Sequence, residues 1–220
     1  MYRTFITAAS LCLSVSSVCF SEAFFETDPE GITYFVPDEC EDSEVSVSLD
    51  QLKSLDPDTR GLNISRENLS IETLKGVVSH FSSLETLMVS DNSLQDEDMP
   101  LITGITTLKE LDICYNPFTA KSIGNLASLE HLRVLKARSL SLENHGIKIL
   151  CSAMPSSLEI LDVTGCDFDG RALTFFQTLQ GLKELHIGAG MSLDHDDVHG
   201  FQEWADQNKI KLVVTNLGSL

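Results

Sequence analysis

Three segments of the chain align without a gap: LETLMVSDNSL (Leu84–Leu94), LKELDICYNPF (Leu108–Phe118) and LEILDVTGCDF (Leu158–Phe168). Each has leucine at its first and fourth positions, Val or Ile at the sixth, Asn or Cys at the ninth and an apolar residue at the eleventh. Weaker copies occupy residues 61–69, 132–142 and 182–193, and a fragment occupies 210–217. A period of this length indicates stacked units that share one continuous core.

The spacing of the fourth-position leucine gives the length of each unit. The seven leucines are separated by 25, 24, 24, 26, 24 and 27 residues: Leu62, Leu87, Leu111, Leu135, Leu161, Leu185 and Leu212. A helix packed behind each strand must also turn apolar residues inward at helical spacing. The fifth and eighth residues after each motif satisfy this requirement in six units: Leu74 and Val77, Met99 and Ile102, Ile123 and Leu126, Ile147 and Leu150, Leu173 and Phe176, Val198 and Phe201.

This pattern resembles the leucine-rich repeat family, and the Cys at the ninth position makes it similar to the ribonuclease-inhibitor-like type, although steps of 24 residues are short for that type. The resemblance implies an α/β solenoid of six to seven repeats, with a parallel inner sheet and outer helices. Asn92, Asn116 and Cys166 should turn inward and pair buried backbone groups. Leu140 and Gly190 depart from the pattern at that position.

Residues 1–21 have the order of a secretory signal peptide: one cation, Arg3, then an apolar stretch and small residues before Glu22. We therefore expect an exported protein, secreted or extracytoplasmic (the periplasm or cell envelope in a bacterium), with no membrane span after cleavage. A buried helix or an uncleaved anchor is the alternative. An uncleaved segment would fit an intracellular adaptor or an effector delivered into a host.

Residues 22–58 form an acidic segment that we interpret as a cap ahead of the repeat domain, 59–220. Between Glu22 and Asp50 there are ten acids and no Lys or Arg. Residues 32–36 and 45–49 have strand character and predict a hairpin; an acidic docking segment is the alternative. The net charge of the chain, −18, opposes binding to nucleic acid.

The sequence offers little for catalysis or for a cofactor. We find no nucleophile elbow, no zinc-protease motif and no phosphate-binding loop. Residues 194–199 crowd acids and two histidines, and a metal-dependent enzyme using Asp194–His199 is one alternative. The simpler interpretation is the start of a helix, where acids are favoured. We predict no enzyme activity and no cofactor.

Four cysteines follow the signal segment, Cys40, Cys114, Cys151 and Cys166, and their spacing leaves disulfides undecided. Asn63 and Asn68 begin two formal glycosylation sequons that are equally undecided.

Side chains that flank the core leucines should project from the inner sheet. We predict a protein partner bound there by seven residues: Asp112, Tyr115, Arg133, Lys136, Arg138, Asp162 and His186. The three cations would form an island between two acids and anchor the partner. Equally, charges on adjacent strands would only neutralise one another. Cys114 and His186 should lie three strands apart, too far to act together.

Overall fold

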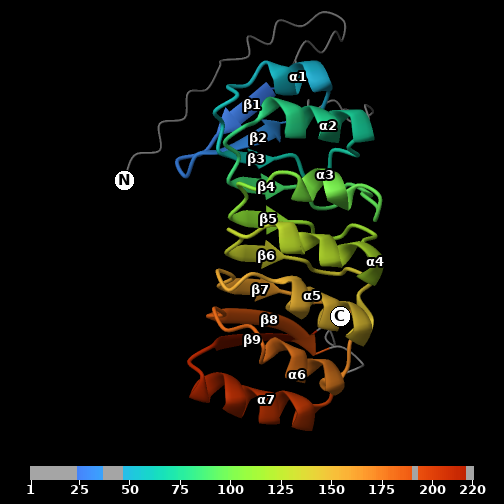
Figure 1. The fold of residues 1–220 in the computed structure, drawn as a ribbon, viewed down its shortest axis with the longest axis vertical. Coiled ribbons are helices and arrows are strands. Elements are labelled where there is room, and N and C mark those ends of the chain that lie inside the picture. Colours follow the sequence, from blue (N-terminus) through green and yellow to red (C-terminus); the bar gives the residue numbers. More distant parts are fainter. Residues whose placement is uncertain (1–23, 37–46, 190–192, 217–220) are drawn as a thin grey trace, which may run out of the picture.

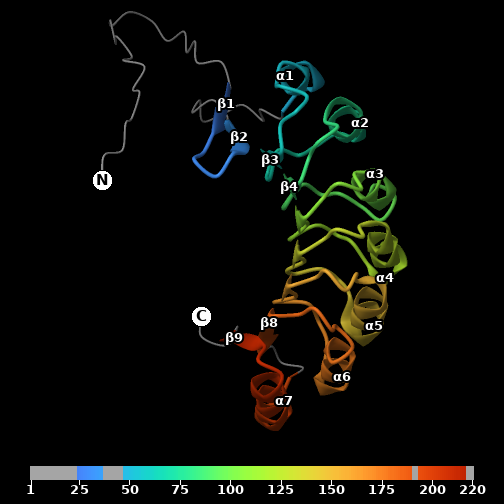
Figure 2. The same ribbon diagram turned by 60° about the vertical axis from the view of Figure 1, so that its left-hand side comes forward.

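The computed structural model describes residues 24–36, 47–189 and 193–216. They form an arc in which one nine-stranded sheet lines the inner side and helices line the outer side (Figure 1, Figure 2). The strands follow the order of the chain, each paired with the next. The first pair is antiparallel and the others are parallel. The predicted leucine-rich repeat solenoid is thereby confirmed.

The strands in the repeats are short, as a solenoid of this kind requires. They are β1 (Phe24–Thr27), β2 (Ile32–Val36), β3 (Gly61–Asn63), β4 (Thr86–Met88), β5 (Glu110–Asp112), β6 (Val134–Lys136), β7 (Ile160–Asp162), β8 (Glu184–Ala189) and β9 (Lys211–Asn216).

The outer layer consists of three longer helices, α2, α5 and α7, and of shorter helical turns before and between them. Its elements are α1 (Leu49–Lys53), α2 (Ile71–His80), α3 (Met99–Thr103), α4 (Ala120–Ile123) with the 3₁₀ segment η1 (Gly124–Ser128), α5 (Glu143–Ala153), η2 (Gly170–Ala172) with α6 (Leu173–Phe176), and α7 (His195–Gln207). No helix in the described ranges is long and apolar enough to cross a membrane.

The core lies between these two layers and follows the predicted register. Six of the seven marker leucines, from Leu62 to Leu185, are fully buried, and Leu212 in the last strand is partly buried. Of the twelve helix positions predicted to face inward, eleven are buried, and Val198 packs on the core while remaining partly exposed. Burial of this apolar surface is the main force that holds the repeats together.

The asparagines at the ninth position bind the backbone of two repeats at once. Asn116 accepts hydrogen bonds from the N–H groups of Asn92 (3.0 Å) and Leu94 (3.0 Å), and its amide donates to the carbonyls of Val89 (3.0 Å) and Ile113 (3.1 Å). Asn92 repeats this arrangement one unit earlier. Both side chains therefore satisfy buried backbone groups, as predicted.

Cys166 occupies the same position with a weaker bond. Its thiol donates to the carbonyl of Ala137 at 3.2 Å, and burial raises its pKa to about 12. A buried, neutral thiol is unreactive, which supports a structural role. Leu140 is buried at the equivalent position, and Gly190 lies outside the described residues. Cys114, Cys151 and Cys166 are free thiols here, and Cys40 lies outside the described ranges.

The predicted hairpin exists, but one of its strands was wrong. Residues 32–36 form β2, whose partner is β1 and not residues 45–49. Val47 and Ser48 are not in a strand, and Leu49 begins α1, while residues 45 and 46 lie outside the described ranges. Ser48 and Gln51 form a capping box, in which each side chain accepts from the other residue's backbone N–H. That local bonding favours a helix over the strand predicted by alternation.

Candidate protein-binding face

The inner face is the surface formed by the residues that flank the marker leucines, by the second residue before and the third and fourth residues after each leucine, and by Tyr34 in β2. The strand register places the predicted rows side by side, so that Met88, Asp112, Lys136, Asp162 and His186 are consecutive neighbours across the sheet. Figure 2 shows the described helices on the opposite, outer side of the arc. The inner face is thus open along the described strands.

The three cations predicted to form an island are each paired with an acid of a neighbouring repeat. Lys136 Nζ lies 2.9 Å from Glu110, and Arg133 lies 2.8 Å from Glu159. Arg138 Nε donates to Asp162 Oδ2 at 2.6 Å. The alternative in which charges on neighbouring strands neutralise one another agrees with these ion pairs, whereas anchoring of a partner by the cations stays a prediction. Lys136 pairs with Glu110 and not with its direct neighbour Asp112.

Asp162 holds the most buried of these pairs. Its side chain is 4% exposed, against 45% for Arg138. Its Oδ1 accepts from the backbone N–H of Thr164 at 3.0 Å, and His186 Nδ1 lies 3.8 Å from Oδ2. The other ring nitrogen of His186 lies 2.7 Å from Glu184. The structure therefore brings Arg138, Asp162 and His186 together in one network.

Asp112 differs from the other acids that flank the marker leucines. Glu110, Asp162 and Glu184 each have a Lys or Arg within 3 Å. Asp112 is half-buried and accepts the N–H of Cys114 through Oδ1 at 3.0 Å, but it has no salt bridge within the described part of the chain. Lys136, its register neighbour on β6, is directed to Glu110 instead, so Asp112 shares no ion pair with it.

Tyr115 stands at the end of β5 with 56% of its surface exposed, and its backbone has a positive φ of 56°. Val134 and Ile160, which sequence reasoning did not select, are half-buried neighbours on adjacent strands of the same face. They lie between the charged positions Glu110 and Glu184 in their row. Apolar side chains surrounded by polar groups are typical of protein interfaces. Listing the residue before each marker leucine would have found them.

Cys114 is almost fully buried, although it was predicted to project from the inner face. Its sulfur accepts the backbone N–H of Arg138 at 3.2 Å. Desolvation, followed by the nearby charge of Asp112, raises the pKa of the thiol well above its ordinary range. The reactive thiolate is therefore strongly disfavoured. His186 lies three strands away in the sheet order, as expected.

A pocket of about 290 Å³ opens on the inner face near the hairpin. Tyr34 pairs with Asn63 across β2 and β3, and the row continues through Met88 to Asp112. Further lining residues are Phe35, Ser65, Arg66 and Ser90. The row from Asn63 to Asp112 was predictable. Tyr34 was missed because nothing in the repeat pattern shows that the hairpin extends the sheet.

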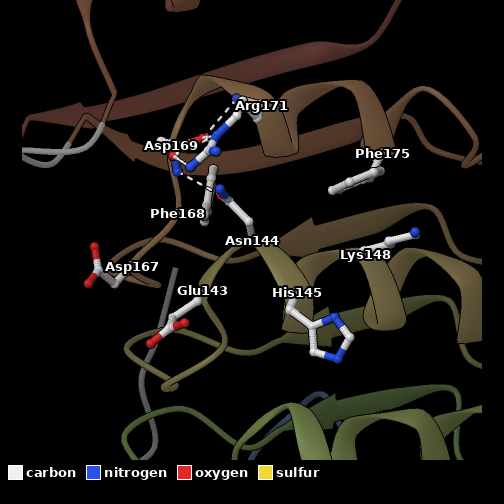
Figure 3. Close-up of a pocket in the computed structure, with 9 residues that line it drawn as sticks. All are labelled: Glu143, Asn144, His145, Lys148, Asp167, Phe168, Asp169, Arg171 and Phe175. Carbon is white, nitrogen blue, oxygen red and sulfur yellow. Dashed lines mark hydrogen bonds and ion pairs between the residues drawn. The ribbon is translucent and has the colours of Figure 1, made fainter.

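A larger hollow of about 630 Å³ lies on the outer side between α5 and the segment of η2 and α6 (Figure 3). Much of its polar lining is already bonded within the fold. Asp169 forms an ion pair with Arg171, and the backbone N–H of Asp169 donates to Asn144 at 2.9 Å. The bond between Asn144 and Asp169 links two neighbouring repeats.

The residues of the metal alternative serve a different purpose. Asp194 caps α7 by accepting the N–H of Asp197 at 2.7 Å, which supports the interpretation as a helix start. The side chains of His195 and Asp196 are almost fully exposed. Within the described ranges, no group of three or more His, Cys, Asp or Glu side chains is arranged to hold a metal ion.

No protein-family model matches the chain, and a search of curated proteins finds no match. Solved structures similar to it include a tropomodulin C-terminal domain from Caenorhabditis elegans, with a TM-score of 0.47 and 18% identity over 60% of this chain and 89% of that one. An internalin from Listeria monocytogenes has a TM-score of 0.43 and 19% identity over 71% of this chain and 40% of that one. Both likenesses are distant, so the assignment of the fold rests on the strand order and the repeat register.

Proposed function

We propose that the chain is a non-catalytic module that binds another protein on its inner face. The observation that carries this proposal is the partly exposed apolar centre of the face. Tyr115, Val134 and Ile160 stand there among charged neighbours, and Figure 2 shows the described helices on the other side of the sheet. Aromatic and aliphatic side chains within a polar rim are the usual anchors of an interface.

The solenoid also lowers the cost of binding. Each strand from β3 to β8 is fixed by parallel pairing to its neighbours and by a buried leucine, so its exposed side chains start from ordered positions. The ion pairs on the face hold Lys136 and Arg138 in place as well. A surface that loses little conformational freedom on association retains more of its contact energy as affinity.

The test compares two isoleucines on opposite sides of the arc, one half-buried on the inner face and one exposed on α2. Ile160 lies on the inner face, and Ile71 lies at the start of α2 with 48% of its surface exposed. The full chain, Ile160→Arg and Ile71→Arg serve as matched baits in an affinity capture from the native source, read by quantitative mass spectrometry. Both variants add one cation, and thermal melts confirm that both fold.

We expect a partner whose recovery falls at least about tenfold with Ile160→Arg, since a central interface residue contributes on this scale, and which Ile71→Arg retains. A partner lost equally with both variants, or retained by both, would move the binding site away from the inner face. If no captured partner depends on Ile160, the proposal is contradicted.

We further propose that the protein is exported and that residues 1–21 are removed. The support is the charge and hydropathy order of that segment and the acid-rich stretch that follows it, both features of the sequence. N-terminal sequencing of the protein from its native source tests this proposal. A start near Glu22 is expected, whereas an intact N-terminus would favour the adaptor or effector alternative.

We also propose that the units carrying α2, α5 and α7 are of the ribonuclease-inhibitor-like type. Their helices have 10, 11 and 13 residues, as full helical repeats require. The intervening units have helices of only four or five residues and differ from that type. A solved structure showing α2 or α5 shortened to a single turn would contradict this classification.

A further inference from the structure

Two strands of the array carry an aspartate at the same register position, and their surroundings differ. Asp112 in β5 and Asp162 in β7 each follow a marker leucine. Each accepts, through Oδ1, the backbone N–H of the residue two positions later, at 3.0 Å in both cases. The two carboxylates are thus held in the same way by their own strands.

The two aspartates differ in the partner of their second carboxylate oxygen, Oδ2. Asp162 Oδ2 receives the Nε–H of Arg138, which lies on the preceding strand segment, two residues after Lys136. The corresponding residue two positions after Met88, ahead of Asp112, is Ser90. A serine hydroxyl is far shorter than an arginine side chain and carries no charge. Beside Asp162, this position is filled by the guanidinium of Arg138. At the equivalent position beside Asp112, the preceding strand supplies no cation.

The equivalent position beside Asp112 lies at the 290 Å³ pocket on the inner face, because Asp112 and Ser90 both line this pocket. Its other polar lining includes Asn63 and the hydroxyl of Ser65. Tyr34 and Met88 provide an aromatic and a thioether wall, and Tyr34 is fixed because its hydroxyl donates to Asp28 at 2.8 Å. Carboxylate, hydroxyl and amide oxygens beside an aromatic ring are the groups that bind guanidinium.

The surrounding charge also favours a cation. Glu26 lies opposite Tyr34 in the hairpin, and the pKa of Tyr34 is raised by its bond to Asp28 and by the charges of nearby acids that include Glu110. Arg66 is the one cation in the pocket lining, and it is directed to Asp91 at 3.8 Å with a highly exposed side chain. The net charge of the chain, −18, further attracts basic partners.

We propose that this pocket is the specificity site of the inner face and that it takes an arginine side chain of the partner, whose guanidinium pairs with Asp112 as Arg138 pairs with Asp162. The partner is therefore a protein that presents an arginine on a basic surface. This inference rests on the proposed function, because it identifies the chemistry of the partner that the inner face binds.

The test uses the full chain and short peptides in place of the unidentified partner. The probes are acetyl-Gly-Arg-Gly-amide and the same peptide with citrulline, which keeps the shape of arginine and removes its charge, or with lysine. Binding is followed by the NMR shifts of the Cys114 and Ser65 amides, because these two N–H groups donate to Asp112 and Asn63 in the pocket.

Two variants remove the site in different ways. Asp112→Asn removes the charge while keeping the shape, and Ser90→Arg places a guanidinium from the chain itself beside Asp112. Asp196→Asn is the matched control, since it makes the same change of charge at a fully exposed position on α7. Ser90→Arg should fill the pocket without loss of stability, because the same pair already exists between Arg138 and Asp162.

We expect saturable shifts with the arginine peptide and binding weaker by at least about tenfold with the citrulline peptide, Asp112→Asn or Ser90→Arg, the effect of losing one charged pair. Asp196→Asn should bind as the unmodified chain does. The proposal is overturned by equal binding of the citrulline or lysine peptide, by unchanged binding in Asp112→Asn, or by absence of shifts with millimolar arginine peptide.

The two proposals fail in distinguishable ways. A captured partner that depends on Ile160 but binds Asp112→Asn as tightly as the unmodified chain would leave the protein-binding face in place and overturn the arginine site. Arginine-peptide binding that depends on Asp112, without any partner that depends on Ile160, would support the pocket and contradict the wider face.

Discussion

The two halves of the solenoid satisfy their polar groups in opposite ways. Inside the array, the half that contains β4 and β5 has Asn92 and Asn116 at the ninth motif position, each bonded to several backbone groups. The half that contains β6 and β7 has Leu140 and Cys166 there, with one thiol bond of 3.2 Å from Cys166 to a carbonyl. At this motif position the first half therefore has more hydrogen bonds to the backbone.

On the inner face the order is reversed. Asp112, in the first half, has no cation partner in the described ranges, whereas Asp162, in the second half, is buried against Arg138. The repeat therefore meets two different requirements, one in its interior and one on its inner face. Buried backbone groups must be paired for the fold to be stable, while an unpaired group at the surface costs little and remains available for a partner.

The largest expected effect tests the interior of the two halves. Asn116→Ala leaves the N–H groups of Asn92 and Leu94 and the carbonyls of Val89 and Ile113 without this partner. We expect a loss of about 3–5 kcal/mol in the free energy of unfolding, against about 1 kcal/mol for Cys166→Ala. Chemical denaturation measures both losses.

The control for these two substitutions is Asn125→Ala in η1, where the side chain is exposed. It should change the free energy of unfolding by less than about 0.5 kcal/mol. Equal losses for Asn116→Ala and Cys166→Ala would show that the two halves do not differ in the way described.

A smaller effect concerns Glu67, which is bonded to Asn92, the first of the two asparagines at the ninth motif position. The N–H of Glu67 donates to Asn92 at 2.9 Å, while the carboxyl of Glu67 is buried with one oxygen, Oε2, without a hydrogen-bond partner. Desolvation raises the pKa of this carboxyl from 4.5 to about 7, against a bond from the backbone of Val47. The folded state therefore holds more protons than the unfolded chain between these two pH values.

The free energy of unfolding should accordingly fall as the pH rises from 4.5 through 7, because the unfolded chain binds fewer protons in that window. Glu67→Gln, which is neutral at every pH, removes this contribution. We expect the variant to gain about 2–3 kcal/mol over the unmodified protein at pH 8 and to match it near pH 4. Melts across this range measure the difference, and parallel pH profiles of the two proteins would contradict the assignment.

The smallest effect compares the two equivalent aspartates. Asp162→Asn weakens a charged pair whose acid is only 4% exposed, so we expect a loss of about 1–2 kcal/mol. Asp112→Asn breaks no salt bridge in the described ranges and should stay within about 0.5 kcal/mol. Each asparagine retains an oxygen for the same backbone N–H. Equal losses in denaturation would mean that Asp112 has a structural partner of its own.

Most of the fold could be predicted because every repeat has apolar residues at the same positions of its sequence. The register of the marker leucines located the strands from β3 to β9, and the apolar positions behind them located the outer layer. The hairpin could be predicted only in part. Residues 45–49 alternate as a strand does, yet the capping box of Ser48 and Gln51 favours a helix from Leu49. Local alternation cannot show which of these two local preferences prevails.

The candidate site was predicted less completely than the fold. The sequence placed the charged residues from Asp112 to His186 on the inner face, and the sheet register agrees. It could not show which acid each cation would select, since Lys136 reaches Glu110 and Arg138 reaches Asp162 along diagonals of the sheet. The pocket beside Tyr34 was missed because it depends on the hairpin pairing with the first repeat.

The sequence by itself determined the repeat, its period and the identity of the buried residues. Burial depends on the spacing of apolar residues, and that spacing can be read directly from the sequence. What only the tertiary structure decided is which polar groups remain unpaired. Asp112 and Asp162 are alike in sequence, each following a marker leucine, yet only one of them meets an arginine. The residue that decides it, Arg138 beside Asp162 and Ser90 beside Asp112, comes next to the carboxylate only after the repeats have stacked.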